Sequence, residues 1–122
     1  MLPNLSGIEF DWFAVDSEGN LALIATAGEG FFPNSVFGNR AAHELLSEAL
    51  PAPRTGTSEV WKDYADLGLY VFDWALPGGP YERQVTPSGK INHELQAKIL
   101  AIPELPKFFG SFSGLQKLER WQ

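Results

Sequence analysis

The chain of 122 residues contains no cysteine, only two histidines and no long run of apolar residues. The absence of cysteine excludes disulfides, zinc–thiolate sites, iron–sulfur clusters and cysteine nucleophiles, and it is typical of a reducing compartment. No apolar run approaches the roughly 18 residues that cross a bilayer, and the first residues lack the basic and apolar regions of a secretion signal. We therefore expect a cytoplasmic protein with no membrane segment.

The histidines also give no sign of a metal site. His43 and His93 fall in different predicted helices and belong to no HxxxH or HExxH pattern. The stretch AGEGFFPNS matches a phosphate loop only in part, because the third glycine of GxGxxG is missing, Pro33 interrupts it and Glu29 would repel a phosphate. We expect neither a metal nor a cofactor.

Basic residues are scarce in the first half of the chain, which carries the whole formal net charge of −6. Residues 1–61 hold eight acidic side chains against two basic ones, whereas residues 62–122 hold seven of each sign. In the second half, Arg83, Lys98, Lys107 and Lys117 alternate with acids as on a solvated face. An acidic surface repels a phosphate backbone and attracts a basic protein, so we expect a protein partner and no nucleic acid.

Apolar and aromatic residues are abundant, at 44% and 13% of the chain, and with this length they predict a single folded domain over residues 1–122. The tripeptide Phe-Asp-Trp occurs twice, at residues 10–12 and 72–74, each time in a run of β-forming residues. The turn residues that follow predict one β-hairpin over residues 8–27 and another over 69–86. In each copy the Phe and Trp share one strand face, which we expect to be buried against helices.

Apolar residues at helical spacing predict helices from residue 34 or 35 to about 50, from 58 to 67, over about 91–101, and in the tail from 113. Ser58 and Ser113 are the expected N-caps, and Gly68 is the expected left-handed C-cap. The predicted fold is therefore α+β, with an antiparallel sheet built from two β-hairpins and helices packed mainly on one face.

Asp11 and Asp73, the central residues of the two tripeptides, are the strongest candidates for catalysis. Two carboxylates on one sheet face could act as general acid and base if their surroundings separated their pKa values. The sequence does not fix their separation, and it shows no nucleophile motif, metal cluster or cofactor loop beside them. We therefore predict no catalytic residues and favour a binding protein over an enzyme.

Three segments, FDWFAVDSEGNLALIATAGEGFFP, WKDYADLGLYVFDW and GPYERQVTPSGKI, carry a resemblance to a known group. They are similar to small bacterial proteins found among polymorphic-toxin immunity proteins and their uncharacterised relatives, in which DWF-x-x-D-x-x-G, GLYxxDW and YxRxxxPS recur. The matching positions are Asp11, Trp12, Phe13, Asp16, Gly19, Gly68, Leu69, Tyr70, Asp73, Trp74, Tyr81, Arg83, Pro87 and Ser88.

The resemblance implies a protein that binds a toxin domain made by the same cell and blocks its active site or its access to substrate. An acidic inhibitor could imitate a phosphate backbone and be steered quickly to a basic, nuclease-like toxin. The predicted partner-binding residues are Asp16 and Glu18 at the tip of the first hairpin and Glu29 in the following turn, because carboxylates on loops can reach a partner.

Two alternatives remain open. One is a small hydrolase or isomerase that uses Asp11 and Asp73. The other is a subunit of a larger assembly, whose interface is formed by the aromatic residues Phe108, Phe109, Phe112 and Trp121.

Overall fold

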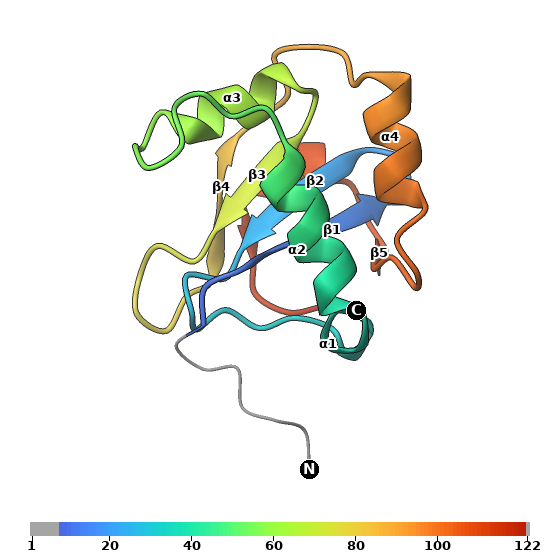
Figure 1. Ribbon diagram of the computed structural model, residues 1–122. Coiled ribbons are helices and arrows are strands. Elements are labelled where there is room, and N and C mark those ends of the chain that lie inside the picture. Colours follow the sequence, from blue (N-terminus) through green and yellow to red (C-terminus); the bar gives the residue numbers. More distant parts are fainter. Residues whose placement is uncertain (1–7, 122) are drawn as a thin grey trace.

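A computed structural model describes residues 8–121, which fold into a sheet with helices on one side (Figure 1). The strands are β1 (Asp11–Asp16), β2 (Leu21–Ala25), β3 (Tyr70–Asp73), β4 (Tyr81–Val85), β5 (Lys107–Phe108) and β6 (Lys117–Leu118). The helices are α1 (Asn34–Gly38), α2 (Arg40–Ala49), α3 (Val60–Asp66), α4 (His93–Leu100) and the 3-10 helix η1 (Phe112–Gly114). The described residues thus have the α+β architecture expected from the sequence.

The sheet has the strand order β5-β1-β2-β3-β4-β6 and is mixed, so the prediction of a purely antiparallel sheet is wrong. Both predicted hairpins exist, as the antiparallel pairs β1–β2 and β3–β4. They are joined by a parallel pairing of β2 with β3, and β5 adds to β1 in parallel as well. The helices between β2 and β3 return the chain to the end where β2 began, which is what a parallel connection requires.

Helices α2, α3 and α4 lie on the same face of the sheet, in front of it in Figure 1, which confirms the prediction of helices mainly on one face. Between the sheet and these helices lies one hydrophobic cluster. Its buried members are Phe13, Val15, Leu21, Leu23, Leu50, Tyr64, Leu69, Val71, Ile99 and Ile102. Asp11 and Asp73 lie on this helical face, since strand side chains alternate between faces.

The aromatic residues of the two Phe-Asp-Trp copies lie on the face opposite α2, α3 and α4, so these helices do not bury them as predicted; of the helical residues only Val36 of α1 and Phe112 of η1 join their cluster among the buried residues described. Phe10, Trp12 and Phe72 are buried there in a second cluster, and Trp74 packs against its edge. The cluster is covered by the segment after β2 and by the C-terminal segment, whose Trp121 meets Trp12 edge to face at 5.3 Å between ring centroids. Both faces of the sheet are therefore buried, and the repeated tripeptide is explained by packing.

The tail does not form the predicted helix. Ser111, instead of Ser113, caps the short η1, and β6 then pairs with the edge of β4 in antiparallel register, Leu118 opposite Tyr81. Leu118 is buried, and Leu115 and Trp121 pack against the aromatic cluster. The outer edge of β4 has backbone N–H and C=O groups that β6 pairs and that a surface helix would leave unpaired. This edge pairing overrides the helical spacing of the apolar residues.

The remaining helices differ from expectation mainly at their ends. The helix predicted from residue 34 is broken at Asn39 into α1 and α2, and Pro33 precedes α1 without a side-chain cap. Glu59, instead of Ser58, precedes α3. Gly68 adopts a φ of +96°, which confirms the left-handed turn predicted after α3. No helix within residues 8–121 is long and apolar enough to cross a membrane.

Candidate functional site

Asp16, one of the three predicted partner-binding residues, has a structural role instead. Its side chain is only 5% exposed. One carboxylate oxygen accepts hydrogen bonds from the backbone N–H groups of Glu18 and Asn20, and the other accepts from the backbone N–H of Phe112 at 2.9 Å. The carboxylate thus shapes the β1–β2 turn and ties it to the C-terminal segment. This burial leaves little of Asp16 exposed for contact with a partner.

Glu18 and Glu29 are exposed, as predicted for contact residues, but they do not lie together. Glu18 sits in the turn that joins β1 to β2, and Glu29 follows the far end of β2. The length of β2 separates them, which at the usual strand rise is about 14 Å. The two side chains therefore belong to opposite ends of the sheet.

Asp11 and Asp73 occupy the same row of the sheet. Ala25 is the register partner of both, antiparallel to Asp11 and parallel to Asp73, so the aspartates are two strand spacings apart, or about 10 Å. Ser47 Oγ donates a 2.8 Å hydrogen bond to Asp11. Burial raises the pKa of Asp11, and the charge of Asp73 raises it further. Burial raises the pKa of Asp73 as well.

A hollow of about 270 Å³ lies where the start of β1 meets α2, and we call it the acidic hollow. Its lining residues are Glu9, Phe10, Asp11, Glu44, Ser47 and Glu48. Four of these six are carboxylates and none is a cation. Arg40 Nε pairs with Glu44 at 3.2 Å and compensates one of the four charges. Asp73 does not line the hollow, so the two aspartates do not open into a common cavity there.

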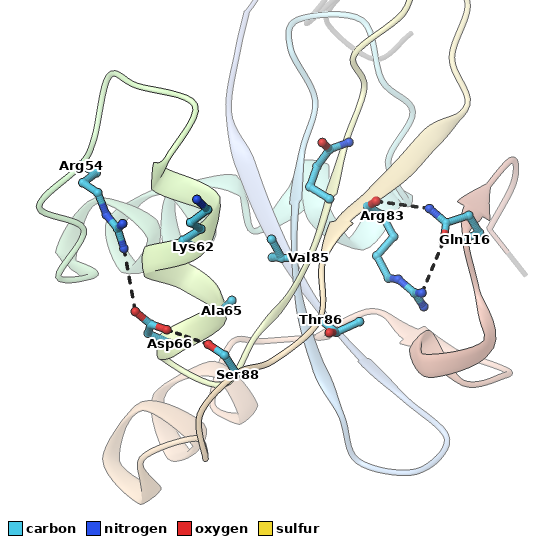
Figure 2. Close-up of a pocket in the computed structure, with 10 residues that line it drawn as sticks. Arg54, Lys62, Ala65, Asp66, Arg83, Val85, Thr86, Ser88 and Gln116 are labelled. Atoms are coloured by element: carbon cyan, nitrogen blue, oxygen red, sulfur yellow. Dashed lines mark hydrogen bonds and ion pairs between the residues drawn. The ribbon is translucent and has the colours of Figure 1, made fainter.

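A larger groove of about 780 Å³ lies between α3, β4 and the start of β6, and we call it the basic groove (Figure 2). Its lining residues are Arg54, Lys62, Ala65, Asp66, Arg83, Gln84, Val85, Thr86, Ser88 and Gln116. Three are cationic and one is anionic. The groove thus gathers positive charge in a chain whose net charge is negative.

Arg83 is fixed on one side of this groove. Its Nη1 donates to the backbone carbonyls of Phe112, Ser113 and Leu115 at 2.9 to 3.2 Å, and its Nη2 donates to Gln116 Oε1. Arg83 was predicted on a solvated face because local charge alternation cannot reveal hydrogen bonds to a segment some 30 residues away. Its place in the YxRxxxPS pattern was the only signal of a special role.

Arg54 and Lys62 lie on the other side of the groove and carry their own ion pairs. Arg54 Nε contacts Asp63 at 2.7 Å, and its Nη2 lies 3.9 Å from Asp66. Burial raises the pKa of Asp63, but the backbone and side-chain hydrogen bonds from Arg54 outweigh it and hold that pKa below its usual value. Lys62 Nζ pairs with Glu59 at 2.6 Å, and this pair is largely exposed.

Of the four aromatic residues predicted to form a subunit interface, three serve the protein's own core. Phe112 is fully buried, and Phe108 and Trp121 pack against the aromatic cluster. Phe109 is the exception and is 80% exposed. A broad aromatic interface is therefore not available on this segment.

Comparisons with protein-family models, with curated proteins and with solved structures found no match to this chain. The resemblance to immunity proteins thus stays a prediction. Among residues 8–121 no group of three or more His, Asp or Glu side chains converges as a metal site would require. The functional inference therefore depends on the acidic hollow and the basic groove.

Proposed function

We propose that this protein is a non-enzymatic binding protein of the immunity type, which neutralises a basic toxin domain by binding it through the acidic hollow. The observation that carries this proposal is the gathering of Glu9, Asp11, Glu44 and Glu48 around one concave surface whose lining includes no cation. A lysine or arginine of a partner would complement the hollow. Such a toxin would be met in the cytoplasm of the cell that makes both proteins.

The energetics of the hollow favour a role in binding. Burial and the negative charges of Asp73, Glu9 and Glu44 raise the pKa of Asp11 above its usual value, although the hydrogen bond from Ser47 opposes them. Folding alone does not need such a concentration of like charge, which costs stability. A cationic partner would relieve the repulsion, and the same field would steer it toward the hollow and speed association.

The alternative of an enzyme that uses Asp11 and Asp73 has less support. The β2 strand separates them, Asp11 is engaged by Ser47, and only Asp11 lines the acidic hollow. A general acid and base must both reach the same substrate, within about 3 Å of the groups that exchange protons. The arrangement therefore suits recognition of a cation better than proton transfer by a pair.

The test is inhibition of a candidate basic toxin domain from the same cell, followed by binding kinetics over a range of salt concentrations. We expect Glu48→Lys in the hollow to slow association about tenfold at low salt and to flatten its salt dependence. Glu94→Lys on α4 makes the same change of net charge away from the hollow and should alter the rate less than about twofold. Equal effects of the two reversals would show that net charge, and not the hollow, attracts the toxin.

A further inference from the structure

We propose that the basic groove binds a small molecule that carries a phosphate group on a polar, non-aromatic body, as a sugar phosphate does. This groove and the acidic hollow are built from different residues. The groove is lined by α3, β4 and the loops beside them together with Gln116, and the hollow is lined by α2 and the residues at the start of β1. The proposal therefore goes beyond toxin binding and does not rest on it.

The charge of the groove selects an anion. Arg54, Lys62 and Arg83 enter it from three separate parts of the chain, and Asp66 is the one carboxylate in its lining (Figure 2). Arg54 and Lys62 carry ion pairs, so the positive charge that attracts a small anion comes mainly from Arg83. The negative charge of the rest of the surface disfavours large polyanions. The positive charge in the groove and the negative charge around it together favour a compact anion as the ligand.

Arg83 provides a preorganised cation. All its hydrogen-bond acceptors among the described residues are neutral, being three backbone carbonyls and the Gln116 amide oxygen. The guanidinium charge therefore has no carboxylate counter-ion there, although the side chain is held in place. Because the side chain of Arg83 is already ordered in the folded protein, ligand binding costs little further conformational entropy there. A planar guanidinium also suits phosphate oxygens well.

Lys62 is the adjustable member of the set. Its pair with Glu59 joins side chains that are 63% and 47% exposed. Exposed pairs of this kind contribute little to stability, about 0 to 1 kcal/mol. Exchange of this pair for a contact with a phosphate in the groove is therefore inexpensive. Arg54, by contrast, is bound to the buried Asp63 and lies 3.9 Å from Asp66, so its charge is largely neutralised within the protein.

The neutral lining indicates the rest of the ligand. Gln84, Thr86, Ser88 and Gln116 present amides and hydroxyls, which both donate and accept hydrogen bonds as the hydroxyls of a sugar do. The lining contains no aromatic ring on which a nucleobase could stack, since its apolar members are Ala65 and Val85. The volume of about 780 Å³ falls in the usual range for small-molecule sites, roughly 300 to 1,000 Å³.

The test is an NMR titration of the full chain with three probes: a hexose phosphate, the same hexose without phosphate, and inorganic phosphate. We expect saturable shifts at the backbone amides of Thr86, Ser88 and Gln116 at millimolar hexose phosphate, weaker binding of inorganic phosphate, and none of the free hexose. Lys62→Gln should weaken the binding of hexose phosphate about fivefold. Lys98→Gln, which removes a similar exposed pair with Glu94 on α4, should change it less than about twofold.

Three results would overturn the proposal. The first is the absence of saturable shifts with hexose phosphate. The second is equal weakening by both lysine substitutions, which would show diffuse attraction in place of a site. The third is equal affinity for hexose phosphate and inorganic phosphate, which would remove the polar body from the ligand. None of these depends on the toxin, so the two proposals can fail separately.

Discussion

His43 Nδ1 accepts a 3.0 Å hydrogen bond from the backbone N–H of Phe13, and the two rings stack nearly parallel at 6.3 Å between centroids. The strand β5 pairs with β1 only at Val15 and Asp16, so the outer edge of β1 at Phe13 lacks a strand partner. The imidazole, carried by α2 and fully buried, supplies the missing acceptor. One side chain therefore fastens α2 to the sheet and satisfies its edge.

This contact predicts a loss of stability in mild acid. Burial lowers the pKa of His43 to about 4, so the folded protein keeps the ring neutral while the unfolded chain takes up a proton below its ordinary pKa of 6.5. Stability should be complete above pH 6.5 and fall as the pH drops toward 4, by up to about 3 kcal/mol from this residue. Urea unfolding at pH 7 and pH 5 measures the slope. His43→Gln should flatten it, whereas the exposed His93→Gln should leave it unchanged.

Substitution of Asp16 should lower the stability of the protein strongly. A residue that served only to bind a partner could be replaced with little loss of stability. Asp16→Ala removes the acceptor for three backbone N–H groups, and we expect a loss of about 3 kcal/mol. Glu18→Ala, two residues away on the exposed turn, should change stability by less than about 0.5 kcal/mol. Thermal unfolding of both variants checks this. Similar midpoints would contradict the structural role of Asp16.

Substitution of Asp11 should raise the stability of the protein, whereas substitution of Asp16 should lower it. Its pKa is raised in the folded state, so the folded protein prefers the protonated carboxyl and loses stability as the pH rises through that pKa. Asp11→Asn removes the charge and keeps an oxygen that can accept from Ser47. We expect a gain of up to about 1 kcal/mol at pH 7 that disappears near pH 3.5. A loss of stability at pH 7 would show that the carboxylate has a favourable internal partner.

The hydrogen bonds of Arg83 attach the C-terminal segment to β4, so we expect substitution of Arg83 to destabilise this attachment. Arg83→Lys keeps the charge but offers one nitrogen where Arg83 uses two, Nη1 for the three carbonyls and Nη2 for Gln116 Oε1. We expect a loss of about 1 to 2 kcal/mol. The near-ultraviolet circular dichroism of the buried aromatic cluster should weaken in parallel. Arg40→Lys, at the i,i+4 pair with Glu44, is the control and should cost less than about 0.5 kcal/mol.

The sequence predicted those features that depend on neighbouring residues. Both hairpins and the left-handed Gly68 follow from local turn chemistry, and the structure contains them. The parallel pairing of β2 with β3 depends on how the connecting segment of residues 26–69, which contains α1, α2 and α3, joins the two hairpins, and no local pattern records this. The prediction of a helix in the tail was wrong for a related reason, because pairing of β6 with the edge of β4 outweighed the helical spacing of the apolar residues.

The candidate sites show the same division. An acidic first half was visible in the sequence, but the residues that gather around the hollow come from the start of β1, the two residues before it, and α2, and not from the predicted turns. Asp16 was misplaced because an exposed turn aspartate and a buried one that organises the turn have the same sequence signature. The basic groove was not predicted, since Arg54, Lys62 and Arg83 converge only through the tertiary fold.

The segment 107–121 supplies both outer strands of the sheet and covers the aromatic face opposite the helices. During translation, a ribosome that has completed β1 to β4 has therefore produced a sheet whose Trp12 and Phe72 still lack the contacts of Trp121 and Phe112. The nascent chain should bind hydrophobic-surface chaperones up to this stage and lose that affinity once residue 121 has left the exit tunnel. The order in which the polypeptide is made thus places the closing of this aromatic face after the synthesis of the four inner strands.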